Sequence, residues 1–134
     1  MMDKASILVI EDDHDIREAI VAVLDEITAI KFDVDQSEEG DEALEKILNG
    51  SYDIILTDLK LPKLEGDEII RQVREKNIKT PIIVLSGYLG SSEVREKLVY
   101  DDVYLLEKPF ESNILIRSIG MLVERLINER SVAN

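Results

Sequence analysis

Five short apolar runs alternate along this chain with amphipathic stretches, and no other feature constrains the fold as strongly. Four of the runs are continuous and partly β-branched, which is typical of strands covered on both faces of a sheet. They read ILVI (7–10), IIL (54–56), IIVL (82–85) and VYLL (103–106). The fifth, FDVD (32–35), alternates apolar with acidic residues, which favours an edge strand with one wetter face.

The stretches between these runs carry apolar residues at the spacing of a helix face. The pattern is clearest at 16–27, shorter at 43–48 and 69–73, weak at 94–98 and long at 115–126. Asp13 or Asp15 is a candidate N-cap for the first helix, and Asn49 with Gly50 predicts the end of the second. Gly120 lies inside the fifth helix, where it weakens the helix by about 1 kcal/mol.

Strict alternation of strands and helices predicts an α/β fold, a parallel sheet with helices on both faces. Right-handed crossovers leave the two common doubly wound orders, and five strands favour the flavodoxin-like order 2-1-3-4-5. A chain of 134 residues fits one domain. We expect residues 1–127 to form it, with 128–134 as a short C-terminal tail and no output domain visible.

Composition excludes several classes of function. The formal net charge is −13 and no Lys/Arg cluster stands out, so we expect no direct binding of nucleic acid by this chain. No apolar run approaches the roughly 18 residues of a membrane span. The N-terminus lacks the features of a signal peptide, so we expect no membrane association and a cytoplasmic location.

In a doubly wound sheet, sites form beyond the carboxyl ends of the strands. Polar residues stand at four of these ends, namely Glu11, Asp12 and Asp13, then Asp58, then Ser86 with Gly87, and last Lys108 with Pro109. Carboxylates that lie close together raise one another's pKa, which a divalent cation relieves. Because the cluster contains oxygen ligands and neither His nor Cys, it predicts Mg²⁺ or Mn²⁺ rather than zinc.

Asp58 is also a nucleophile that can form an aspartyl phosphate. A metal ion and Lys108 would neutralise the phosphoryl oxygens, and Ser86 could donate a hydrogen bond to one of them. Taken singly, Asp58 could be a turn former before Pro62, Lys108 a surface lysine, and Ser86 part of a turn. Their convergence on one rim of the predicted sheet favours the chemical interpretation.

Four motifs, ILVIEDD, DIILTDLKLP, PIIVLSGY and LEKPF, occur in this order and resemble the receiver domain of bacterial two-component response regulators. The resemblance runs from about Ser6 to Leu126. It implies that Asp58 is the phosphorylated residue. It also implies that Glu11, Asp12, Asp58 and the backbone carbonyl of Lys60 hold the metal ion.

The resemblance implies a second group of residues that contact the phosphoryl group. Ser86 matches the switch hydroxyl, Gly87 the small residue that leaves the phosphoryl group accessible, and Lys108 the lysine of the family, followed by a peptide bond that is usually cis. The family usually has an aromatic residue three positions before this lysine. That position is Leu105 here, and Tyr104, one residue earlier, should point to the other face of the strand. Both are secondary switch candidates.

The implied function is a phospho-acceptor signalling module. It would take a phosphoryl group from a sensor histidine kinase or phosphotransfer protein, catalyse no reaction but its own phosphorylation and dephosphorylation, and switch a surface for a downstream protein or output domain. That surface would comprise the fourth helix, fifth strand and fifth helix. The fifth helix carries more apolar residues than one stripe can bury, so a homodimer through this surface is a further expectation.

Three other functions are alternatives to this one. A flavin-binding electron carrier would need a phosphate cradle after its first strand, where EDDHD (11–15) would repel phosphate. A haloacid-dehalogenase-type phosphatase would need an acid at the position of Lys60. The serious alternative is a receiver-like interaction module that works without phosphorylation.

Overall fold

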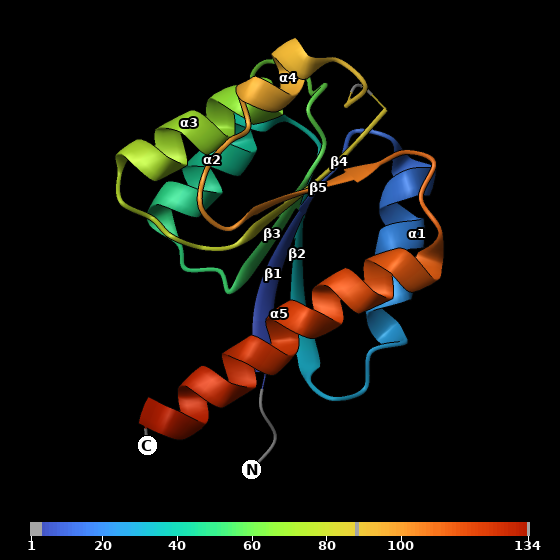
Figure 1. The fold of residues 1–134 in the computed structure, drawn as a ribbon, viewed down its shortest axis with the longest axis vertical. Coiled ribbons are helices and arrows are strands. Elements are labelled where there is room, and N and C mark those ends of the chain that lie inside the picture. The colour runs from blue at the N-terminus through green and yellow to red at the C-terminus, as the bar shows by residue number, and fades with distance from the viewer. Residues whose placement is uncertain (1–3, 88, 134) are drawn as a thin grey trace.

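The computed structural model describes residues 4–87 and 89–133, and Figure 1 shows their arrangement. The strands are β1 (Lys4–Ile10), β2 (Lys31–Ser37), β3 (Ile54–Thr57), β4 (Ile82–Ser86) and β5 (Val103–Glu107). The helices are α1 (His14–Asp25), α2 (Gly40–Asn49), α3 (Gly66–Glu75), α4 (Ser92–Glu96) and α5 (Ser112–Ala133). All strand pairs are parallel, and the order β2-β1-β3-β4-β5 confirms the predicted flavodoxin-like sheet.

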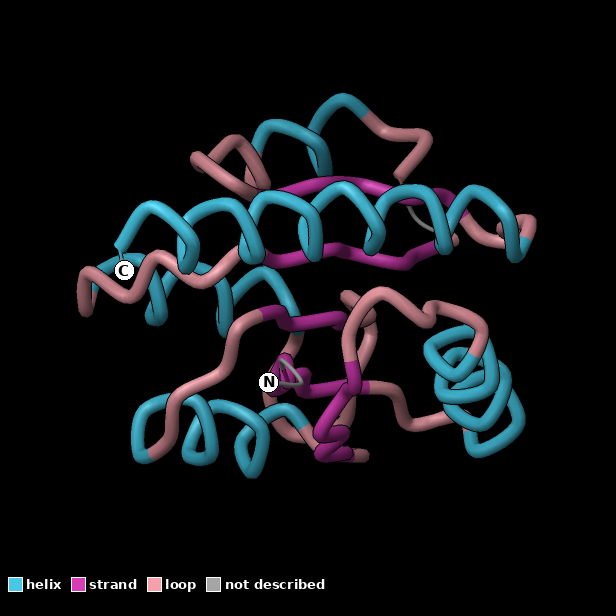
Figure 2. The backbone as a smooth tube through the Cα atoms, turned by 90° about the horizontal axis from the view of Figure 1, so that it is seen from below, coloured by secondary structure: helices cyan, strands magenta, loops and turns pink. Residues whose placement is uncertain are grey.

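Two apolar cores, one on each face of the sheet, follow from the alternation of strand side chains. Ile7 and Val9 pack with residues of α1 and α5 on one face. Leu8 and Ile10 pack with residues of α2 and α3 on the other. Figures 1 and 2 show the helices on both sides of the strands. Because both faces are covered, the central strands could be recognised as continuous apolar runs.

The helix ends agree with the capping signals for α1 and α2. The Asp13 side chain accepts a hydrogen bond from the Ile16 amide at 3.1 Å, so Asp13 rather than Asp15 is the N-cap of α1. Helix α2 ends at Asn49, and Gly50 follows it as expected.

Helix α5 runs further than its apolar pattern suggested, because residues 128–133, expected as a tail, continue it to Ala133. Arg130 in this extension donates to the Lys4 carbonyl at 2.7 Å and to the Asp53 carboxylate at 3.2 Å. The last turns are therefore held against the amino ends of the strands. Among the described residues, none of the helices combines the length and the apolar composition needed to span a lipid bilayer.

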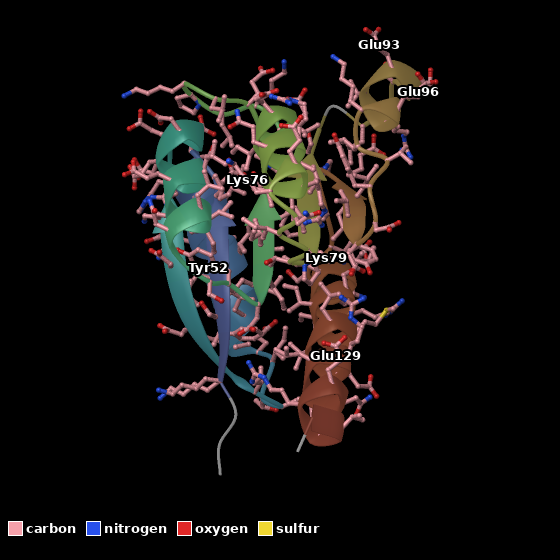
Figure 3. All side chains as sticks on the ribbon, turned by 90° about the vertical axis from the view of Figure 1, so that its left-hand side faces the viewer. Tyr52, Lys76, Lys79, Glu93, Glu96 and Glu129 are labelled. Atoms are coloured by element: carbon pink, nitrogen blue, oxygen red, sulfur yellow. The ribbon has the colours of Figure 1, made fainter. Side chains whose placement is uncertain are left out.

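The elements at the β5 edge are less buried than their sequence suggested. The run VYLL predicted a strand covered on both faces, but β5 is an edge strand, and none of its five residues is fully buried. Helix α4 has only five residues, again none of them buried. Figure 3 shows Glu93 and Glu96 of α4 pointing away from the body of the molecule. Tyr88, the last residue of the PIIVLSGY motif, lies outside the described residues.

Two glycines allow a close approach around the loop that follows β3. The Gly40 amide donates to the Pro62 carbonyl at 3.0 Å, and a Cβ on Gly40 would lie 1.7 Å from the Leu64 carbonyl oxygen. A Cβ on Gly66 would lie 2.2 Å from the carbonyl oxygen of Asp58. The first residues of α2 and α3 therefore pack closely against residues 58–64, and this close contact restricts the path of the chain after Asp58.

This packing predicts opposite effects for two Gly→Ala changes. Gly40→Ala should lower the free energy of unfolding by about 1–3 kcal/mol, because the added methyl meets a backbone oxygen that must move. Gly120→Ala, where nothing lies within 4 Å of an added Cβ, should raise it by about 1 kcal/mol through helix propensity. Urea unfolding of both variants measures the two changes, and equal effects would contradict the described packing.

Candidate functional site

Asp58 lies at the carboxyl end of β3, next to the end of β1. Its amide donates to the Ile10 carbonyl at 3.1 Å, which continues the pairing of the two strands by one residue. Its carboxylate is nearly buried, with 9% of the residue exposed. The Leu59 amide donates to Asp58 Oδ1 at 2.7 Å. One carboxylate oxygen is thus held by the backbone of the following residue.

Lys108 brings the end of β5 into the same cluster. Its ammonium Nζ donates to Glu11 Oε1 at 2.6 Å and to Asp58 Oδ2 at 2.9 Å. Its backbone amide donates to the Ser86 carbonyl at 2.9 Å, and the bond from Lys108 to Pro109 is cis, as the resemblance implied. A single cation therefore joins carboxylates from the ends of β1 and β3.

The protonation equilibria of the cluster reflect its burial. Burial raises the pKa of Glu11 above its ordinary value, and the Asp58 carboxylate adds to this; the hydrogen bond from Lys108 offsets only part of it. Burial lowers the pKa of Lys108, but the hydrogen bonds and charges of Glu11 and Asp58 outweigh this and raise it. Lys108 is therefore charged, and one positive charge faces two carboxylates.

Asp12 completes a set of donors that suits a hard divalent cation. Carboxylate oxygens of Glu11, Asp12 and Asp58 all lie within 4.8 Å of one another. Asp12 is exposed, and its side chain has no partner within residues 4–87 and 89–133. Carboxylates with room for water are the ligands that Mg²⁺ prefers. The residues present therefore fit Mg²⁺ or Mn²⁺.

The lone histidine is engaged elsewhere. His14 Nε2 lies 3.2 Å from Glu18 on the exposed side of α1. The side chain of Lys60 pairs with Glu65 at 3.2 Å, and the role of the Lys60 carbonyl toward a metal ion stays a prediction.

Ser86 and Gly87 lie on the β4 side of Asp58. Ser86 is fully buried at the end of β4, opposite Glu107 of β5. Apart from its chain neighbours, nothing lies within 4 Å of a Cβ built on Gly87, so there is open space next to this residue. The strand order thus brings residues from the ends of β1, β3, β4 and β5 to one rim, as expected. Their individual roles stay predictions.

The two secondary switch candidates lie on opposite faces of β5. Leu105 packs into the core beneath α3 and α4. The Tyr104 hydroxyl donates to Asp102 at 2.7 Å and accepts from Arg125 of α5 at 3.4 Å. The one-residue offset therefore turns the aromatic side chain to the α5 face.

Arg17 of α1 contacts the site and was missed by motif reasoning. It is only 6% exposed, and its guanidinium donates to the Glu11 carbonyl at 2.8 Å. A signal existed in the sequence, because position 17 shares the buried face of the helix with Ile20 and Leu24. An arginine on an apolar face requires buried acceptors.

Comparison with known proteins identifies the family. Residues 7–120 match the model of the response regulator receiver domain. The transcriptional regulatory protein DltR of Streptococcus agalactiae (serotype III, strain NEM316) is 39% identical over 115 residues, which are 86% of this chain and 50% of DltR. The chain spans about half the length of the curated relatives it matches.

Two solved structures agree with this result. The receiver domain of Francisella response regulator 1452 is 34% identical, with a TM-score of 0.78 over 91% of this chain and 98% of that one. The receiver domain of sensor histidine kinase PA1611 from Pseudomonas aeruginosa PAO1, with a magnesium ion coordinated in its active site cleft, is 27% identical; its TM-score is 0.76 over 90% of this chain and 98% of that one. The chain therefore belongs to the receiver domains of two-component response regulators, a family of phosphoryl-accepting signalling modules.

Proposed function

We propose that Asp58 is the phosphoryl acceptor of this receiver domain. One observation carries the proposal: the Lys108 ammonium bridges Asp58 and Glu11 at the rim where three carboxylates meet. An aspartate used only as a turn former would not need a cation brought from the end of another strand. The phosphoryl donor is a phosphohistidine of a sensor histidine kinase or phosphotransfer protein.

In the transfer, an oxygen of the Asp58 carboxylate attacks the phosphorus atom of the phosphohistidine. The O–P bond forms as the P–N bond breaks, and the electron pair of that bond stays on the imidazole nitrogen. No general base is needed, because the ionised carboxylate has no proton to lose. Lys108 stays within reach of the phosphoryl oxygens, Ser86 donates a hydrogen bond to one of them, and the space next to Gly87 admits the donor. Hydrolysis later returns Asp58 and inorganic phosphate, and this is the only catalysis we propose.

Glu11, Asp12, Asp58 and the Lys60 carbonyl are the proposed ligands of a divalent cation. When bound, Mg²⁺ or Mn²⁺ neutralises negative charge that accumulates on the phosphoryl oxygens. The oxygen-only donor set and the magnesium ion in the Pseudomonas relative support this assignment.

The phosphorylated module acts on a downstream protein or output domain through α4, β5 and α5. On this face Ile114 and Met121 of α5 are exposed, and Met121 lines a hollow of about 140 Å³ together with Tyr104 and Arg125. Two further apolar residues of α5, Ile116 and Ile127, instead pack partly buried against the core. The exposed residues support a homodimer through this surface. Family membership supports a cytoplasmic location, and the net charge of −13 argues against direct nucleic-acid binding by this chain.

The alternative function is an interaction module that works without phosphorylation. The intact acidic cluster, Ser86 and Lys108 argue against it, since none of them would be required.

Asp12→Ala should nearly abolish both Mg²⁺ binding and phosphorylation, because Asp12 is an exposed carboxylate of the cluster whose side chain has no other partner among the described residues. Calorimetric titration with Mg²⁺ measures the binding, with Asp15→Ala on the exposed side of α1 as the control. If Asp12→Ala binds Mg²⁺ as well as the wild type does, the metal site is elsewhere.

Acetyl phosphate with Mg²⁺ should add one phosphoryl group to the wild type and none to Asp58→Asn, as measured by intact mass. Lys108→Ala should slow the reaction about 100-fold, because a cation no longer meets the phosphoryl oxygens. Lys79→Ala is the matched control, because Lys79 is an exposed lysine between α3 and β4, labelled in Figure 3. An adduct that maps by peptide mass to a Ser or Thr instead would reject Asp58 as the phosphoryl acceptor.

Beryllofluoride, which replaces the phosphoryl group on Asp58, should raise the dimer fraction, since a ligand shifts an equilibrium by its differential affinity for the two states. Met121→Lys should suppress the shift, because Met121 is 66% exposed on the proposed interface. Leu48→Lys on α2, at 41% exposure, should leave it intact. Sedimentation at one protein concentration decides this, and a monomer under both conditions would reject the dimer.

A further inference from the structure

Arg17 is a buried cation that the transfer step itself does not use. Besides the Glu11 carbonyl, its guanidinium donates to Gln36 Oε1 at 3.0 Å and to Glu38 Oε1 at 2.8 Å, and it lies 3.1 Å from His14 Nδ1. We propose that Arg17 is a positioning residue for the divalent cation, because it holds the peptide between the two acidic ligands at the end of β1. This inference rests on the proposed metal site.

The backbone of Glu11 is fixed at both ends. Its amide donates to the Ser37 carbonyl at 3.0 Å, and its carbonyl accepts from Arg17 at 2.8 Å. That carbonyl belongs to the planar peptide group between Glu11 and Asp12. Its orientation therefore sets the direction in which the Asp12 side chain points. Among the described residues nothing else holds the Asp12 side chain. The backbone, and through it Arg17, therefore aims this carboxylate.

The end of β2 and the loop that follows it hold the guanidinium in place. Gln36 and Glu38 accept from two different nitrogens of Arg17, and Glu39 pairs with Lys63 at 2.9 Å in the loop after β3. The planar, fork-shaped guanidinium of Arg17 donates to three acceptors. A lysine cannot replace this fork, because it presents only one compact ammonium group. Loss of the fork would free the Glu11–Asp12 peptide without removing any metal ligand.

The direction of the change in Mg²⁺ affinity when Arg17 is replaced distinguishes a positioning role from a purely electrostatic one. A cation next to the cluster repels a divalent metal ion, so by Coulomb's law alone its removal would tighten Mg²⁺ binding. Positioning predicts the opposite result, because misdirected ligands bind the ion less well. Arg17→Met removes the charge and keeps the aliphatic stem, whereas Arg17→Lys keeps the charge and removes the fork.

The test is titration with Mg²⁺ alone by calorimetry, together with the Mg²⁺ dependence of phosphorylation by acetyl phosphate. Both Arg17 variants should bind Mg²⁺ about tenfold more weakly, the size of effect typical for residues that orient metal ligands. The half-saturating Mg²⁺ concentration should rise by the same factor, while the maximal rate at saturating Mg²⁺ falls far less.

Arg74→Lys is the matched control. Arg74 is a half-buried arginine that also donates to backbone carbonyls, those of Ile78 at 2.8 Å and Asp101 at 3.1 Å, and it lies in the last turn of α3. This variant should lower the melting temperature and leave Mg²⁺ affinity as in the wild type.

Two outcomes would overturn the inference. Unchanged Mg²⁺ affinity in Arg17→Lys would make the role of Arg17 purely structural, and tighter binding in Arg17→Met would make it electrostatic. In either case phosphorylation of wild-type Asp58 would leave the proposed function standing. If the wild type itself fails to bind Mg²⁺, both proposals fail. Arg17→Lys decides the matter alone if Arg17→Met does not fold.

Discussion

The contact of one ammonium group with two carboxylates is the interaction on which the site depends. Lys108 reaches Glu11 and Asp58 only because β1, β3 and β5 end at the same rim of the sheet. Charges this poorly hydrated are costly unless they are paired and hydrogen-bonded. With Asp12 nearby the carboxylates still outnumber the cation, and this excess of negative charge suits the cluster to a divalent ion, whose charge would offset that of a phosphoryl group.

The apolar cores on the two faces of the sheet explain why these strand ends meet with their side chains oriented toward the site. Ile10 lies opposite Thr57, and Ser86 lies opposite Glu107, so the next residues emerge from the sheet at matching levels. A shift of one residue in any strand would turn its apolar set to the wrong core. The packing of Ile7, Leu8 and Val9 against two different helix layers therefore also protects the geometry of the site.

The sequence predicted the five strands, their order and the residues at the rim, because central strands of a parallel sheet appear as continuous apolar runs and sites follow their carboxyl ends. It overestimated the burial of β5, whose composition resembles that of a central strand although it lies at the edge. It missed Arg17: the helical spacing places this arginine on the buried face of α1, but its partners are a backbone carbonyl and residues 19 and 21 positions away, and such contacts leave no local pattern that would identify them. It also ended α5 early, because Arg130 is held by polar contacts rather than by the apolar stripe.

The position of Tyr104 limits how a change at Asp58 can reach the β5 edge. In this chain the residue three positions before Lys108 is Leu105, which is packed into the α3 and α4 core, while Tyr104 is held on the α5 face by Asp102 and Arg125. No aromatic ring therefore stands at position 105, on the β5 face opposite α5. The hydrogen bond from the Lys108 amide to the Ser86 carbonyl, by contrast, ties the end of β4 to the residue that contacts Asp58. Displacement of either end of this bond would move the backbone of both strands, which gives the site a main-chain connection to β5.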